Sequence, residues 1–232
     1  MFLFIFICDM AFNHNPQIVH KNLIFCFDAL DKNSYPGTGT TWTDIISDAT
    51  TTLSNSPTFN SAGYFDFDGS DDYMSMTSDH NITAAKTVSA WVNTDSNHNG
   101  IFISVDDVGS NRFFQFKKKS GGTIMFVGFN SSNSSSTTQT DSSMANDVWI
   151  NATAVQHSNG NVKLYINGSL AKTNSSTYTV RTGSSTVFFG KNEGGSANQL
   201  NGQMATAHYY NRDLSAEEVL QNFNATKGRF GV

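Results

Sequence analysis

Residues 162–171 read VKLYINGSLA, and this stretch predicts the fold class of the chain. Val162, Leu164 and Ile166 alternate with Lys163 and Tyr165, which is the period of a half-buried strand. The next two residues are Asn-Gly, a dipeptide that favours a type I′ turn into a second strand at 169–171. The stretch is therefore predicted to be a β-hairpin.

The same period-two alternation recurs along most of the chain. Further strands are expected around residues 65–67, 88–92, 101–105, 114–116 and 124–129. Turn-forming Gly, Asn, Asp or Ser residues separate these segments, and no helical pattern interrupts them. We therefore predict an all-β, two-sheet antiparallel jelly-roll sandwich over residues 19–232.

One helix is expected, near the C-terminus. Ser215 and Glu218 form the S-x-x-E pattern of a capping box, and apolar residues follow at helical spacing. Lys227-Gly228 is expected to end the helix. The segment 130–143 contains ten Ser or Thr in fourteen residues and is expected to mix strand and loop.

The composition excludes several functions. Asn, Ser and Thr make up 77 of the 232 residues, whereas charged residues make up only 14%. With a net charge of −5 the chain lacks the basic stripe that binds nucleic acid. No apolar run is long enough to span a bilayer, because residues 1–8 are apolar for only eight positions. We therefore expect no nucleic-acid and no membrane partner.

The N-terminal residues 1–18 are expected to form an arm or an extra strand. They lack the positive region and the cleavage site of a signal peptide. The two cysteines, Cys8 and Cys26, leave two alternatives open. A bridge between them is possible, but Cys26 lies in an apolar run, which favours a buried free thiol.

Several motifs together resemble the laminin-G-like domain of the concanavalin A-like lectin/glucanase superfamily. In chain order they are 23–29, Ser34-Tyr35-Pro36-Gly37, Thr41-Trp42-Thr43-Asp44, 67–73, 88–92, Trp149, 164–168, 200–202 and 210–219. The resemblance covers about residue 20 to the C-terminus and implies the same sandwich fold. It is less specific for function, because this fold includes lectins, glycosidases and structural modules.

The Ser-Tyr-Pro-Gly segment and the tail at 224–231 are also similar to domains of tailed-phage proteins. This resemblance implies a non-catalytic decoration or adhesion protein on the virion surface, or an extracellular one. Its expected partners are host glycans, other virion proteins or further copies of itself. A free-standing lectin is the alternative, and an atypical glycoside hydrolase is less favoured.

The hydrolase alternative requires paired carboxylates. Glucanases of this superfamily carry two Glu and an Asp on one strand, whereas the chain has only three Glu, two of them in the predicted helix. Asp66 and Asp68 share a strand face, but Asp68 belongs to a turn motif with Asp71 and Asp72. The sequence also lacks an H-E-x-x-H motif and a G-x-S-x-G motif. We therefore predict that the chain is not an enzyme.

Candidate binding residues come from loops and from one strand. A sugar site needs an aromatic surface beside carboxylate and amide groups. The candidates for it are Tyr35, Trp91, Asp106, Asp107, Asn111 and Tyr178. Asp106 and Asp107 are also candidate ligands of calcium, which prefers oxygen donors, although a solvated Asp-rich turn is favoured. No other cofactor is expected.

Overall fold

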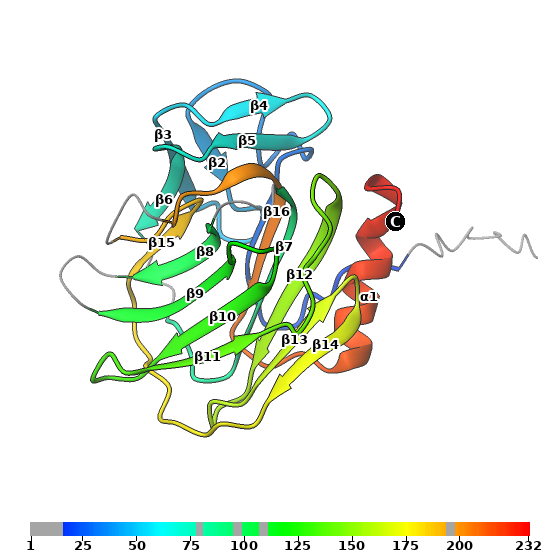
Figure 1. The fold of residues 1–232 in the computed structure, drawn as a ribbon. Helices are drawn as coiled ribbons and strands as arrows, with labels where there is room; N and C mark the ends of the chain where they lie inside the picture. The colour runs from blue at the N-terminus through cyan, green and yellow to red at the C-terminus, as the bar shows by residue number, and fades with distance from the viewer. Residues whose placement is uncertain (1–15, 78–80, 95–98, 107–110, 194–197) are drawn as a thin grey trace, which may run out of the picture.

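The computed structural model describes residues 16–77, 81–94, 99–106, 111–193 and 198–232, and these form two packed antiparallel sheets (Figure 1). This confirms the predicted sandwich. Sheet I contains, in spatial order, β14 (Ser169–Asn174), β13 (Val162–Ile166), β12 (Trp149–Gln156), β7 (Lys86–Thr94), β16 (Asn201–Tyr210), β5 (Tyr64–Asp68) and β4 (Thr58–Asn60), and β1 (Leu23–Asp28) also pairs with β16. Sheet II contains, in order, β11 (Ser135–Gln139), β10 (Ile124–Phe129), β9 (Arg112–Lys118), β8 (Gly100–Asp106), β15 (Thr186–Phe189), β6 (Tyr73–Thr77), β3 (Thr50–Ser54) and β2 (Thr41–Thr43).

The core between the sheets is mostly aromatic. Phe114 of β9 stacks on Tyr209 of β16, with ring centroids 6.4 Å apart and planes 2° apart. Phe27 of β1 meets Phe189 of β15 at 5.3 Å, and Trp42 is fully buried beside them. Each such side chain contributes roughly 1.5–3 kcal/mol by leaving water. Alternation along the strands therefore provides the inward-facing rings that hold the two sheets together.

The predicted hairpin is present as β13 and β14. Asn167 and Gly168 between them have φ angles of +50° and +74°, as a type I′ turn requires. Val162 and Leu164 point into the core, as their alternation predicted. The polar segment 130–143 contains β11 at an edge of sheet II, which confirms the expected mixture of strand and loop.

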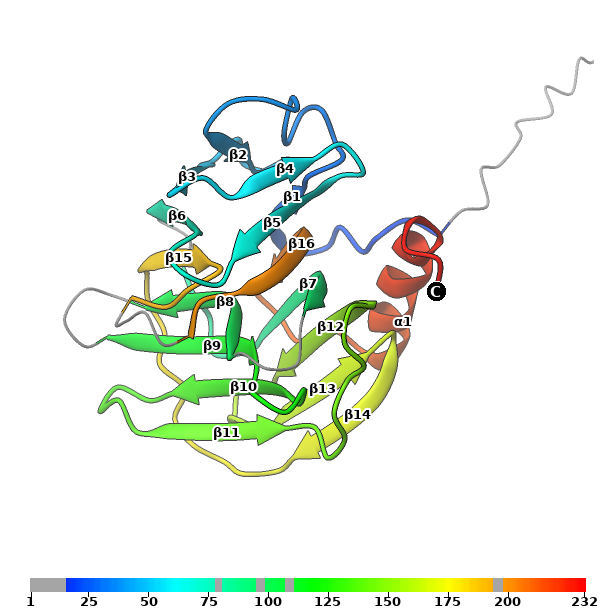
Figure 2. The same cartoon turned by 45° about the horizontal axis from the view of Figure 1, so that its top comes forward.

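Helix α1 (Ala216–Thr226) covers part of the outer face of sheet I (Figures 1 and 2). Its predicted capping box is confirmed: the Ser215 side chain accepts from the Glu218 amide, and the Glu218 side chain accepts from the Ser215 amide. The predicted end at Lys227-Gly228 is confirmed, because α1 ends at Thr226 with Lys227 as its C-cap. The chain then continues as the 3₁₀ helix η2 (Lys227–Arg229), which the sequence did not predict. This extra turn brings the following Phe230 back onto sheet I, where it stacks on Trp91.

The N-terminal arm lies mostly outside the described residues. Its last residue, Ile18, packs with Val19 beside α1, and the Val19 amide donates to Asn222 of the helix. Cys26 is a buried free thiol, and burial raises its pKa to about 12, whereas Cys8 lies outside the described residues. In the described part of the chain no helix is long and apolar enough to cross a membrane.

Candidate functional site

A row of polar side chains crosses sheet I on its outer face. The register pairs Asp66 of β5 with Gln203 of β16, Gln203 with Asn93 of β7, and Asn93 with Trp149 of β12. These four positions are therefore neighbours in the sheet. Figure 2 shows their strands β5, β16, β7 and β12 side by side. We call Asp66, Gln203, Asn93 and Trp149 the polar row.

The polar row faces away from the core because each member alternates with a buried residue. Phe65, Met204, Val92 and Ile150 occupy the adjacent inward positions. Each member of the row is partly exposed. The row therefore presents one carboxylate, two amides and an indole to solvent along a single line.

A hollow of about 240 Å³ opens beside the polar row. Its lining residues are Asp66, Phe67, Asn93, Asp147, Asn201, Gly202 and Gln203. The Asn93 amide nitrogen donates to the Gln203 side-chain oxygen at 3.2 Å, which orients both amides. Two carboxylates and three amides therefore meet around a space with the size of a small ligand group.

An aromatic ridge borders the Trp149 end of the row. The Trp149 ring lies 5.5 Å from the ring of Tyr64 and 4.9 Å from that of Phe230, measured between centroids. We use the name aromatic ridge for Tyr64, Trp149 and Phe230. An apolar ring surface beside amides and carboxylates suits a sugar, which has apolar C–H faces and hydroxyl edges.

The structure places Trp91 and Tyr35 away from solvent. Trp91 is fully buried although its position faces outward on β7, because Phe230 stacks on it at 4.0 Å and its indole nitrogen donates to Thr226. Tyr35 is 3% exposed and its ring packs on Phe59. We therefore remove both from the candidate contact residues, since neither offers a ring face to a ligand.

The other sequence candidates do not join the hollow. The Tyr178 ring covers Gly128 and Gly160, where a Cβ atom would collide with it, and its hydroxyl accepts from Gln156. Exposed Asn111 accepts a hydrogen bond from Arg181 at 2.5 Å. Asp107 lies outside the described residues, so its roles in sugar and calcium binding stay predictions.

Asp106 is a buried carboxylate on β8 of sheet II. It is 2% exposed, and neither of its oxygens has a hydrogen-bond partner among the described residues. Burial raises its pKa to about 6, and the nearby positive charge of Arg112 opposes this rise. Burial and the nearby Lys119 charge lower the pKa of Lys117, and the negative charge of Asp106 opposes this shift.

Because its pKa is raised by burial, ionised Asp106 lowers the free energy of unfolding at neutral pH. Between about pH 4 and pH 6 the folded chain holds a proton that the unfolded chain has lost, so stability falls as pH rises through this window. We expect Asp106→Asn to remove this decline and to raise the free energy of unfolding at pH 7 by about 1–3 kcal/mol. Urea unfolding at pH 4, 5, 6 and 7 measures the effect, and Asp141→Asn at an exposed ion pair is the control. Equal pH profiles for wild type and Asp106→Asn would contradict the argument.

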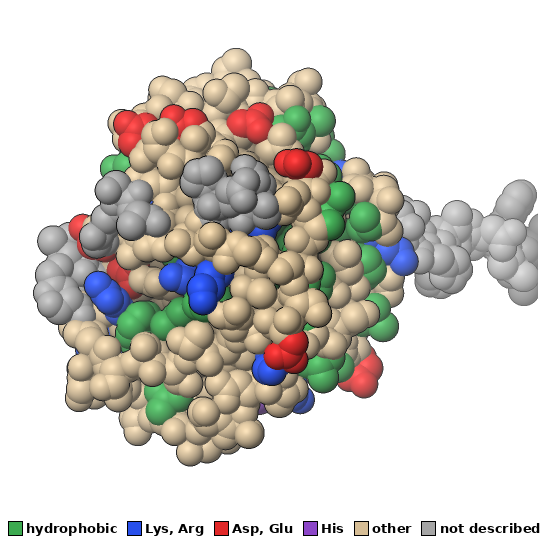
Figure 3. Space-filling model, in the orientation of Figure 1, with side chains coloured by type: hydrophobic (Ala, Val, Ile, Leu, Met, Phe, Trp, Pro, Cys, Tyr) green, Lys and Arg blue, Asp and Glu red, His purple; other side chains and the backbone are tan. Residues whose placement is uncertain are grey.

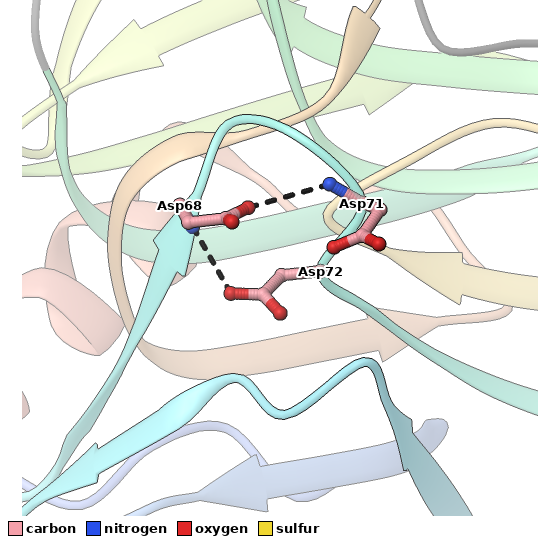
Figure 4. Close-up of side chains that lie close together, drawn as sticks. All are labelled: Asp68, Asp71 and Asp72. Carbon is pink, nitrogen blue, oxygen red and sulfur yellow. Dashed lines mark hydrogen bonds between the residues drawn. The ribbon is translucent and has the colours of Figure 1, made fainter.

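An acidic turn joins β5 to β6 (Figure 4). The carboxylate oxygens of Asp68, Asp71 and Asp72 lie within 4.8 Å of one another. Asp68 Oδ1 accepts from the amides of Ser70 and Asp71, and Asp72 Oδ2 accepts from the Asp68 amide at 3.1 Å. These bonds cap the turn, which is the role expected from the sequence, and they lower the pKa of Asp68.

The outer face of sheet II carries basic and hydrophobic side chains side by side (Figure 3). Lys191 Nζ lies 3.4 Å from the centroid of the Tyr73 ring and 5.2 Å from that of Phe188. The ammonium group therefore covers this aromatic pair through cation–π contacts. We place the candidate site on sheet I instead, because its aromatic ridge adjoins a hollow formed by described residues.

The sequence reasoning did not identify the polar row as a site. Asp66 was considered only as half of a carboxylate pair with Asp68, and Trp149 only as a motif of the family resemblance. The available indication was that Asp66, Asn93 and Gln203 are polar residues at outward positions of alternating strands. Their proximity depends on the strand order, which local alternation does not contain.

Comparison with known proteins agrees with the observed fold. Residues 68–220, more than half of the chain, match a laminin G family model described as the concanavalin A-like lectin/glucanases superfamily. No curated protein sequence matches the chain.

Among solved structures, the botulinum neurotoxin serotype D binding domain is similar, with 18% identity, a TM-score of 0.68 and 89% of this chain covered. The serotype D ligand binding domain in complex with N-acetylneuraminic acid gives 17% identity, a TM-score of 0.69 and 89% coverage. The chain covers 52% and 51% of those two structures, about half of their length. At this identity they show the fold alone, whereas the family model shows membership. The chain belongs to the concanavalin A-like lectin/glucanase superfamily.

Proposed function

We propose that the chain is a non-catalytic glycan-binding module. The observation that carries the proposal is the polar row beside its hollow, where Asp66, Gln203 and Asn93 align with Trp149. Carboxylate and amide groups accept and donate hydrogen bonds to vicinal hydroxyls, and the aromatic ridge supplies an apolar surface for a sugar ring. Superfamily membership and the sugar ligand of one structural neighbour support the proposal.

The charge of the hollow favours a neutral glycan. Asp66 and Asp147 line it, and among the described residues that line it there is no Lys or Arg. A sialic acid carboxylate would meet these two negative groups, and like charges at a partly desolvated site disfavour binding. We therefore expect neutral oligosaccharides to bind more tightly than their sialylated counterparts.

The binding test is a panel of neutral and acidic polysaccharides and bacterial surface glycans, measured with calcium and with chelator. Saturable binding to a neutral glycan is the expected result. Loss of binding with chelator would support the calcium alternative, for which Asp106 and Asp107 are the candidate ligands. Failure of wild type to bind any glycan in a panel that includes host surface polysaccharides would contradict the proposed function.

Gln203→Ala is expected to weaken glycan binding about 10-fold, because one or two hydrogen bonds to hydroxyls are lost and Asn93 loses its partner. Gln139→Ala is the matched control, since it removes another partly exposed strand amide, on the outer face of sheet II. Isothermal titration calorimetry with the bound glycan measures both. Equal affinities of the two variants would place the site elsewhere.

The biological setting is also a proposal: a decoration or adhesion protein on a phage virion surface, or an extracellular one. It rests on the sequence resemblance to tailed-phage domains, and self-association or contact with other virion proteins belongs to it. Mass spectrometry of purified particles tests it, with the chain expected among the virion proteins. The hydrolase alternative predicts release of reducing sugar from the bound glycan, and we expect none.

A further inference from the structure

A second hollow, of about 380 Å³, lies where the chain end meets sheet I. Thr206 of β16 and Asp28 of β1 line it from the sheet. Asn224 of α1, Arg229 of η2 and Phe230 line it from the C-terminal segment. It is distinct from the first hollow, because no described residue lines both.

Two polar groups of this hollow are buried without a partner. Thr206 is 2% exposed, and its hydroxyl has no hydrogen-bond partner within the described part of the chain. Arg229 Nε is buried and unpaired in the same way. The other Arg229 nitrogens are used, since one donates to Asp28 Oδ1 at 2.6 Å and another to the Gly63 carbonyl. Buried polar groups are usually satisfied in folded proteins, so these two are available to bond a group that enters the hollow.

The lining indicates the chemistry of that group. The charge of Arg229 is offset by Asp28, so the hollow does not select a strong anion. Arg229 Nε donates a hydrogen bond, the Thr206 hydroxyl donates or accepts, and Leu30 and Phe230 supply apolar walls. An uncharged ring with several hydroxyl groups matches this combination of donors, acceptors and apolar surface.

The second hollow also adjoins the first site. Phe230 lines it and belongs to the aromatic ridge beside the polar row. Gly63, whose carbonyl accepts from the lining residue Arg229, directly precedes β5, and Asp66 of β5 lines the first hollow three residues further on. A strand rises about 3.4 Å per residue, so these two points are roughly 10 Å apart. A short oligosaccharide spans such a distance.

We propose that the second hollow is a further subsite for the same glycan, which binds another of its sugar units through Thr206 and Arg229. This inference rests on the proposed function. It assigns the first hollow and the second hollow to different units of one neutral oligosaccharide that crosses the aromatic ridge.

The test compares Thr206→Val with Thr138→Val, using neutral gluco-, manno- and galacto-oligosaccharides of one to six units as probes. Valine keeps the shape of threonine and removes its hydroxyl. Thr138 is the matched control because it is also a buried strand threonine with an unpartnered hydroxyl, on β11 of sheet II. We expect Thr206→Val to weaken binding of the longer oligosaccharides about 10-fold and Thr138→Val to leave it unchanged.

A second measurement follows the Arg229 Nε–H resonance in ¹⁵N-labelled protein. The longer oligosaccharides are expected to shift it together with the Asn93 and Gln203 side-chain amides. Shifts at Asn93 and Gln203 without a shift at Arg229, and with normal affinity of Thr206→Val, would overturn the second subsite while leaving the proposed function intact. The hollow would then hold ordered water only. Shifts at Arg229 alone would support the second hollow as a sugar site and overturn the role of the polar row, and no shifts at all would overturn both.

Discussion

Trp91→Ala is expected to lower the free energy of unfolding by about 3–5 kcal/mol, because it empties the space of a fully buried indole. The ring is stacked between sheet I and the C-terminal segment, 4.0 Å from Phe230 and 5.9 Å from Phe223. Its nitrogen also donates to Thr226 at 2.8 Å. The substitution therefore removes the main attachment of the helix end and of the aromatic ridge that Phe230 completes.

Trp149→Ala is the control for this prediction. Trp149 is partly exposed, so its loss is expected to cost less stability and to weaken glycan binding while the chain remains folded. Urea unfolding followed by circular dichroism gives the stability of both variants. A loss below about 1 kcal/mol for Trp91→Ala would contradict its structural role and would return it to the contact candidates.

Gly202→Ala is expected to cost about 3 kcal/mol or more, through backbone strain and steric collision. Gly202 has a φ of +139°, which an L-residue with a side chain rarely adopts. An added Cβ would lie 2.4 Å from the Asn93 carbonyl oxygen and 2.9 Å from Thr94 Cα, both backbone atoms of the neighbouring strand. The strand pair β16–β7 must therefore separate at the position where it forms the first hollow.

Gly39→Ala separates collision from strain. Gly39 has a φ of +106°, yet no atom lies within 4 Å of an added Cβ, so only the conformational strain remains. We expect it to cost about 1–2 kcal/mol and to leave glycan affinity unchanged. Denaturant midpoints and calorimetric titration measure both variants. If Gly202→Ala proved as stable as Gly39→Ala and bound glycan normally, the close approach of β16 to β7 at Gly202 would not be required for the fold or the site.

The local features of the fold could be predicted because they depend on neighbours in sequence. The alternation at residues 162–166, the Asn167-Gly168 turn and the capping box of Ser215 and Glu218 are local, and each is present in the structure. The family could be inferred from motif order for the same reason. The helix end was also predicted, but the 3₁₀ turn η2 that follows it was not, because that turn is coupled to the contact of Phe230 with Trp91 far away in the sequence.

By itself the sequence determined which residues face outward on each strand, whereas the tertiary structure decided which of them meet. Trp91 and Asn93 both face outward on β7, yet the chain end covers the first and leaves the second partly exposed. Asp66, Asn93 and Gln203 become neighbours only because β16 lies between β5 and β7 in sheet I. A period of two defines the face of a strand, but strand order and register depend on long-range packing of the two sheets. The candidate site therefore arises from the pairing of strands that are distant along the chain.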